Sequence, residues 1–78
     1  MRYSYSPNTF QQLANILNQA QANGNSVYFS TANGNAYVIQ NICNNKICCS
    51  YVGTQNKKEL SWDEFKKLII EFWEDIKE

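Results

Sequence analysis

The sequence predicts a single α+β domain over residues 1–78, built from an N-terminal helix, a three-stranded antiparallel meander and a C-terminal amphipathic helix. Three observations predict this order: apolar residues at helical spacing near both ends, period-two alternation between them, and asparagine-rich turn signals within the alternating segment. A chain of 78 residues forms one domain at most, and its 44% hydrophobic content is enough for one packed core.

The first predicted helix spans residues 7–22. Ser6 and Pro7 suit an N-cap and a first helical position, because the hydroxyl accepts a free backbone amide and proline has no amide to leave unpaired. One apolar stripe follows at steps of three and four residues, and it consists of Phe10, Leu13, Ala14, Leu17 and Ala20. Asn23-Gly24 then supplies a left-handed stop signal.

The meander is predicted between residues 26 and 52, where side chains alternate with period two. Asn33-Gly34 is typical of a two-residue turn, which would place Phe29 opposite Val38. Asn44-Asn45 is a second, weaker turn signal that brings the third strand back beside the second.

The second predicted helix begins at Ser61. Ser61 and Glu64 have capping-box spacing, while Leu60 and Phe65 occupy the positions of a hydrophobic staple. The apolar stripe of this helix contains Trp62, Phe65, Leu68, Ile69, Phe72, Trp73 and Ile76. We also expect a short N-terminal edge strand over residues 2–5, where tyrosine and serine alternate.

The predicted register divides the meander into two faces, and a slip of one residue would exchange them. The predicted core face consists of Val27, Phe29, Ala36, Val38, Ile42, Ile47, Cys49 and Tyr51. The other face would present Tyr28, Tyr37, Ile39, Cys48 and Val52. Exposed apolar surface of this kind marks interaction sites, and tyrosine is enriched at interfaces. Alternatively, the N-terminal strand or a helix covers this face and makes it ordinary core.

A second candidate surface is the acidic end of the second predicted helix, which carries Glu71, Glu74 and Asp75. The helix dipole disfavours negative charge at this end. The acids are either a solvated face or a docking surface for a basic partner.

The sequence contains few side chains of the kinds that catalysis or metal binding requires. The chain has no histidine, which is the commonest general base and transition-metal ligand. Cys43, Cys48 and Cys49 do not form a zinc set, because adjacent residues of a strand point to opposite faces. We therefore expect no enzyme activity, no cofactor, no metal and reduced thiols.

Charge and hydropathy give further expectations. Seven basic and seven acidic residues leave a net charge of zero, so nucleic-acid binding is not expected. No apolar run is long enough to span a membrane, and the N-terminus lacks the pattern of a secretion signal. These features predict a cytoplasmic protein without a membrane partner, in the host cytoplasm if it is viral.

Residues 5–40 resemble the N-terminal half of Phd/YefM antitoxins. The matching features are Tyr5-Ser6, Leu13, Leu17, Ala20, Val27-x-Phe29-Ser30, Asn33-Gly34, Ala36 and Val38. This resemblance implies a dimer that binds operator DNA and neutralises a toxin. The basic DNA contacts of that family have no counterpart here beyond Arg2.

The predicted order of helix, three-strand meander and helix, with its hairpin over residues 33–39, also resembles small phage-encoded anti-CRISPR inhibitors. That resemblance implies a non-enzymatic inhibitor or regulator, from a phage or another mobile element, that binds a larger protein. This is the leading hypothesis, and the antitoxin-like regulator is the alternative. The sequence leaves open whether the chain also forms a homodimer.

Overall fold

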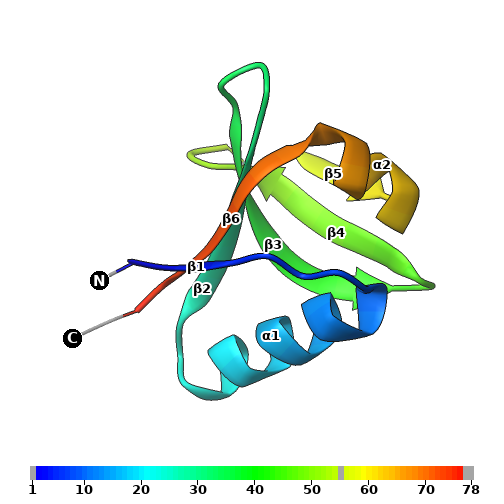
Figure 1. Cartoon of the computed structure of the whole chain (residues 1–78). Helices are drawn as coiled ribbons and strands as arrows, with labels where there is room; N and C mark the ends of the chain where they lie inside the picture. The colour runs from blue at the N-terminus through cyan, green and yellow to red at the C-terminus, as the bar shows by residue number, and fades with distance from the viewer. Residues whose placement is uncertain (1, 55, 77–78) are drawn as a thin grey trace.

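A six-stranded antiparallel sheet and two helices make up the part of the chain that the computed structural model describes, residues 2–54 and 56–76 (Figure 1). The elements are β1 (Arg2–Tyr5), α1 (Phe10–Ala22), β2 (Ser26–Thr31), β3 (Ala36–Cys43), β4 (Lys46–Tyr51), β5 (Lys57–Leu60), α2 (Trp62–Leu68) and β6 (Ile69–Asp75). The strand order across the sheet is β1-β6-β2-β3-β4-β5. In Figure 1 α1 lies below the twisted sheet and α2 at its upper right, and the Phe10 ring of α1 contacts the Trp62 ring of α2 with centroids 6.1 Å apart.

The predicted fold class is wrong in its strand count and in its C-terminal helix. The meander β2-β3-β4 exists, but β5 extends it on one side and β6 and β1 extend it on the other. Residues 69–75 form a strand because their β-branched and aromatic side chains suit a pleated surface. As a strand they also pair with β2, whose backbone groups would otherwise form an open edge. The predicted edge strand over residues 2–5 is confirmed, and it pairs with β6.

The second helix begins as predicted and ends early. The Ser61 hydroxyl accepts a hydrogen bond from the Glu64 backbone amide at 3.2 Å, and the Glu64 carboxylate accepts one from the Ser61 amide. The capping box is therefore confirmed. The helix stops at Leu68, and Ile69 already has the extended backbone of β6.

The predicted start of the first helix is wrong by three residues. Thr9 is the N-cap, and its hydroxyl accepts a hydrogen bond from the Gln12 amide at 3.1 Å. Ser6 and Pro7 instead connect β1 to the helix. The predicted stop is confirmed, since the helix ends at Ala22 and Gly24 has a φ of +75°.

The β2-β3 hairpin differs from the prediction by one residue. Its loop has a third residue because Gly34 adopts the left-handed conformation and the Thr31 amide donates to the Asn35 carbonyl at 3.0 Å. Phe29 therefore pairs with Tyr37 and not with Val38. This slip moves Tyr37 and Ile39 into the core, where 6% and 3% of their surfaces are exposed.

The β3-β4 hairpin has the predicted turn. Asn44 and Asn45 both have positive φ, and Cys43 pairs with Lys46 across them. A register shift between Ile39 and Asn41 offsets the slip of the first hairpin. Beyond this shift, Ile42 pairs with Ile47 as predicted.

Two rows of paired side chains form the core face of the sheet. One row runs Tyr3, Glu74, Val27, Ile39, Cys49 and Lys58, and the other runs Tyr5, Phe72, Phe29, Tyr37 and Tyr51. Leu13, Leu17 and Ala20 of α1 and Phe65 of α2 complete the buried cluster. Ala36 and Val38, which the sequence predicted in the core, are half-buried on the opposite face. Neither described helix is long and apolar enough to cross a membrane.

Candidate functional site

The face of the sheet that points away from the core is the candidate site, and we call it the open face. Its central row takes one residue from each strand: Ser4, Trp73, Tyr28, Val38, Ser50 and Lys57. The flanking rows contain Arg2, Asp75 and Ser26 on one side and Glu71, Ser30 and Ala36 on the other. Both described helices contribute their buried residues to the core face, as is usual for an antiparallel sheet with one solvated side.

An aromatic pair lies at the centre of this face. Tyr28 and Trp73 are direct neighbours across β2 and β6, and their rings stack with centroids 5.7 Å apart and planes inclined by 17°. The Arg2 guanidinium lies over the Trp73 ring, 4.0 Å from its centroid, and forms an ion pair with Glu71. The Tyr28 ring and the Arg2 guanidinium both contact the Trp73 indole and fix its orientation, and Tyr28 and Trp73 are each half-buried.

A shallow hollow of about 300 Å³ adjoins the aromatic pair. It is lined by Tyr28, Ala36, Val52, Trp73 and Asp75. Val52 is 50% exposed, and its amide donates a hydrogen bond to the Ala36 carbonyl. The lining is mostly apolar, with one carboxylate and one hydroxyl among its side chains.

The structure places most of the predicted contact residues on one face. Tyr28, Cys48, Val52, Glu71 and Asp75 all belong to the open face or its hollow. The sequence predicted Glu71 and Asp75 at the end of the second helix, separate from the sheet. They belong to the sheet because residues 69–75 form a strand. The two predicted surfaces are therefore one.

Tyr37, Ile39 and Glu74 are the exceptions, and their predicted exposure is wrong. Tyr37 and Ile39 face the core because of the longer hairpin loop. Glu74 is 6% exposed and alternates with Trp73 onto the core face. None of the three offers its side chain to a partner.

Glu74 is instead the acceptor of a buried hydrogen-bond network. Its carboxylate accepts hydrogen bonds from the Tyr5 hydroxyl at 2.8 Å and from the Asn25 side-chain amide at 2.6 Å. Burial and the bond to Glu74 raise the pKa of Tyr5 to about 12. A buried carboxylate requires such donors, so Glu74 ties β1 and the start of β2 to β6.

Trp73 and Arg2 are the site residues that the sequence reading missed. The sequence pattern predicts Trp73 in the apolar stripe of a helix, and it offers Arg2 only as a DNA contact within the antitoxin resemblance. The run Ile69, Ile70, Phe72 and Trp73 has high strand propensity, which is the local signal that could have identified this segment.

The three cysteines have free thiols in different environments. Cys49 is buried, its thiol contacts the Lys58 carbonyl at 3.5 Å, and burial raises its pKa to about 11. Burial and the neighbouring Cys43 thiol raise the pKa of Cys48. Within residues 2–54 and 56–76, no three cysteine or carboxylate side chains gather as a metal site would require.

Comparison of the chain with protein-family models, with curated proteins and with solved structures found no significant match. The resemblances to antitoxins and to anti-CRISPR inhibitors therefore stay predictions.

Proposed function

We propose that this chain is a non-enzymatic protein-binding module, an inhibitor or regulator that occupies a surface of a larger protein through its open face. The observation that supports this function most is the Tyr28-Trp73 stack beside an apolar hollow, with Arg2 held over the indole. Tyrosine, tryptophan and arginine are the residues that dominate binding energy at protein interfaces.

The shape of the open face also favours a protein partner. Six strands spaced by about 4.8 Å give a surface roughly 24 Å wide. A surface of this width is large enough to form one side of a protein–protein interface of standard size. The hollow is mostly apolar, which suits an apolar side chain of a partner. Glu71 and Asp75 form a polar rim beside it.

A binding role fits the chemistry of the chain better than catalysis does. The sequence contains no histidine. The pKa values of Cys48 and Cys49 are raised, which keeps these thiols protonated and poorly nucleophilic at neutral pH. The carboxylate of Glu71 is paired with Arg2, and that of Glu74 is buried.

We further propose that the chain is encoded by a phage or another mobile element. In this role it would block a defence protein in the cytoplasm of the host. The alternative, an antitoxin-like dimer on DNA, has weaker support. Lys57 and Lys58 are adjacent in β5 and so point to opposite faces, and Arg2 is already paired with Glu71. The basic side chains therefore do not form the continuous positive surface that DNA binding requires.

Capture with matched variants tests the proposed function. Tagged wild-type chain and the double variant Tyr28→Ser with Val52→Ser are incubated with extract of the native host, and the retained proteins are quantified by mass spectrometry. We expect one or more proteins that the wild type retains and the double variant loses. Loss of a central aromatic contact typically weakens affinity by about 30-fold.

Tyr3→Ser is the control, because Tyr3 is 55% exposed but belongs to a core-face row at the sheet edge. This variant should retain the same proteins as the wild type. Circular dichroism should show all three chains folded at the capture temperature, although loss of the Tyr28-Trp73 stack should lower the unfolding temperature of the double variant. Equal retention by the wild type and the double variant would contradict the proposal. Salt-dependent retention on a DNA column, with no protein captured, would favour the antitoxin-like alternative.

A further inference from the structure

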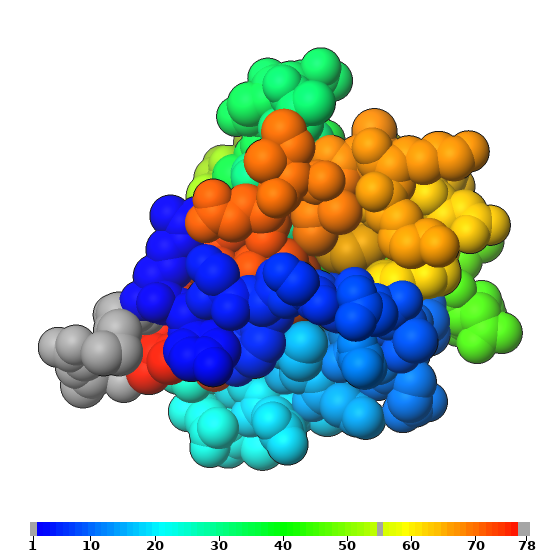
Figure 2. Space-filling view, in the orientation of Figure 1, coloured from blue at the N-terminus to red at the C-terminus, as the bar shows by residue number. Residues whose placement is uncertain are grey.

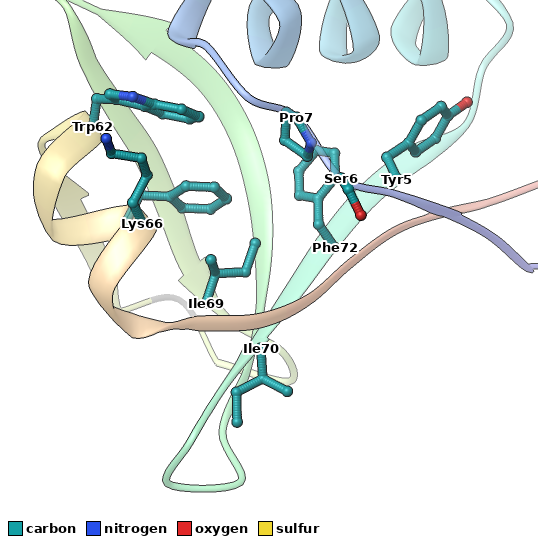
Figure 3. A pocket seen from close by; sticks show the side chains of 9 residues that line it. Tyr5, Ser6, Pro7, Trp62, Lys66, Ile69, Ile70 and Phe72 are labelled. Atoms are coloured by element: carbon teal, nitrogen blue, oxygen red, sulfur yellow. The ribbon is translucent and has the colours of Figure 1, made fainter.

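A second hollow lies on the other side of β6, and we call it the α2 cleft (Figure 3). Its volume is about 290 Å³, near the lower end for small-molecule sites. Three segments meet there: the residues that follow β1, the helix α2 and the first half of β6. Figure 2 shows these segments side by side on one face, in dark blue, yellow to orange and orange.

The walls of the cleft are aromatic and arranged around a slot. Trp62 and Phe65 stack with centroids 5.7 Å apart and planes inclined by 22°. Phe72 stands nearly perpendicular to Phe65, with centroids 6.0 Å apart and an angle of 88°. Pro7 and Ile69 complete the apolar lining. Phe65 and Phe72 are each 1% exposed and form the floor of the cleft, so the half-buried Trp62 indole is the ring that a bound aromatic group would contact.

The cleft exists because the chain departs from regular structure on both sides. Helix α2 ends after seven residues, and the chain leaves it as a strand, so no further turn of helix follows Leu68 to fill the space beside Ile69. Opposite, Ser6 and Pro7 form an irregular link in place of a first helical turn. Figure 3 shows these two segments on opposite sides of the opening, with Ile70 pointing away from it.

Two of the three polar groups at the rim, on the exposed residues Lys66 and Ser6, are donors that face solvent. The Lys66 ammonium lies 5.8 Å from the centroid of the Trp62 ring and has no ion pair among the described residues. The Ser6 hydroxyl likewise has no hydrogen-bond partner within the described chain. The Tyr5 hydroxyl already donates to Glu74, and no carboxylate lines the cleft. An apolar slot with an unpaired cation complements an apolar anion.

We propose that the α2 cleft binds a small aromatic carboxylate, with its ring against the half-buried Trp62 indole and its carboxylate on the Lys66 ammonium. This site is separate from the open face, because successive residues of β6 point to opposite sides and the cleft contains Phe72 where the open face contains Trp73. A test of ligand binding at the α2 cleft therefore does not depend on whether the open face binds a protein.

The two tryptophans allow each side to be observed separately. The chain has two tryptophans, one in the cleft and one on the open face, so its ¹⁵N–¹H spectrum contains two indole resonances that Trp62→Phe assigns. Phenylacetate is titrated into the wild-type chain, with 2-phenylethanol as the neutral analogue. We expect a saturable shift of the Trp62 resonance, with a Kd on the order of 1 mM, and little change at Trp73.

Two lysine variants test the contact with the carboxylate. Lys66→Gln should weaken phenylacetate binding by about 3-fold, as expected for a partly exposed ion pair, and leave 2-phenylethanol binding unchanged. Lys67→Gln is the matched control, since Lys67 is the next residue of α2 and does not line the cleft. The proposal is wrong if the Trp62 resonance does not move, if the neutral analogue binds as tightly as phenylacetate, or if both lysine variants weaken binding equally.

Discussion

The two sides of β6 carry similar residues in opposite environments. Phe72 and Glu74 face the core, where 1% and 6% of their surfaces are exposed. Trp73 and Glu71 face the open side, where Trp73 is half-buried and the side chain of Glu71 is 42% exposed. Each side has one aromatic ring, and the core side has one carboxylate where the open side has two, Glu71 and Asp75. The strand therefore compares the same kinds of side chain in a buried and in an exposed environment.

The two sides differ in the contacts that their carboxylates need from neighbouring side chains. On the core side the Glu74 carboxylate has two hydrogen-bond donors, because a buried charge without partners would destabilise the fold. On the open side Arg2 contacts both Glu71 and Trp73, but water can replace either contact. The core side therefore contributes more to stability than the open side does.

Replacement of the two aromatic rings should give the largest contrast. Phe72→Ala removes a fully buried ring and should lower the free energy of unfolding by about 3–5 kcal/mol. Trp73→Ala removes a half-buried stack and should cost about 1–2 kcal/mol. Urea denaturation followed by circular dichroism measures both. Equal losses would mean that the open face is part of the core.

The carboxylates should give the next largest contrast. Glu74→Leu leaves the Tyr5 hydroxyl without its acceptor, which should cost about 1–3 kcal/mol. Adding Tyr5→Phe to this variant removes the unpaired hydroxyl and should recover part of the loss, as a double-mutant cycle in urea would show. A double variant less stable than the sum of the single changes would contradict the assigned network.

Alkaline pH should weaken the core side through two groups. The pKa of Tyr5 rises from 10 to about 12 and that of Cys49 rises from 9 to about 11 on folding. Both raised values favour the neutral form in the folded state, so this stabilisation is complete below pH 9 and is lost as the pH rises to 12. Urea midpoints measured from pH 8 to pH 12 should fall accordingly.

Two variants separate these groups. Cys49→Ala should flatten the decline between pH 9 and pH 11, and Tyr5→Phe should flatten it between pH 10 and pH 12, because each removes one titrating group. Profiles that coincide with the wild type would show that these side chains do not titrate differently in the folded and unfolded chains.

The sequence predicted features that depend on a few neighbouring residues. The capping box of Ser61 and Glu64, the stop at Gly24 and the Asn44-Asn45 turn are each determined by local hydrogen bonds or by positive φ, and all three are confirmed.

The predictions that failed depend on residues far away in the sequence, or on whether a hairpin loop has two or three residues. Residues 62–76 have apolar side chains at helical spacing, yet the open edge of β2, more than 30 residues away, makes the second half a strand. Asn33-Gly34 suits loops of two or three residues equally, and only the longer loop turns Tyr37 and Ile39 inward. The candidate site was therefore found in part: Tyr28 and Val52 were identified, and Trp73 was missed.

The smallest expected effect concerns the ion pair of the open face. Glu71→Gln removes the charge that pairs with Arg2, and both side chains are about half exposed, at 42% and 51%. The change in the free energy of unfolding should stay within about 0.5 kcal/mol and disappear in 1 M NaCl, where charges are screened within about 3 Å. Urea denaturation at low and high salt measures it. A loss above about 1 kcal/mol that persists in salt would mean that Arg2 and Glu71 hold β1 on the sheet. A small loss would mean that the ion pair contributes little to the attachment of β1 to β6.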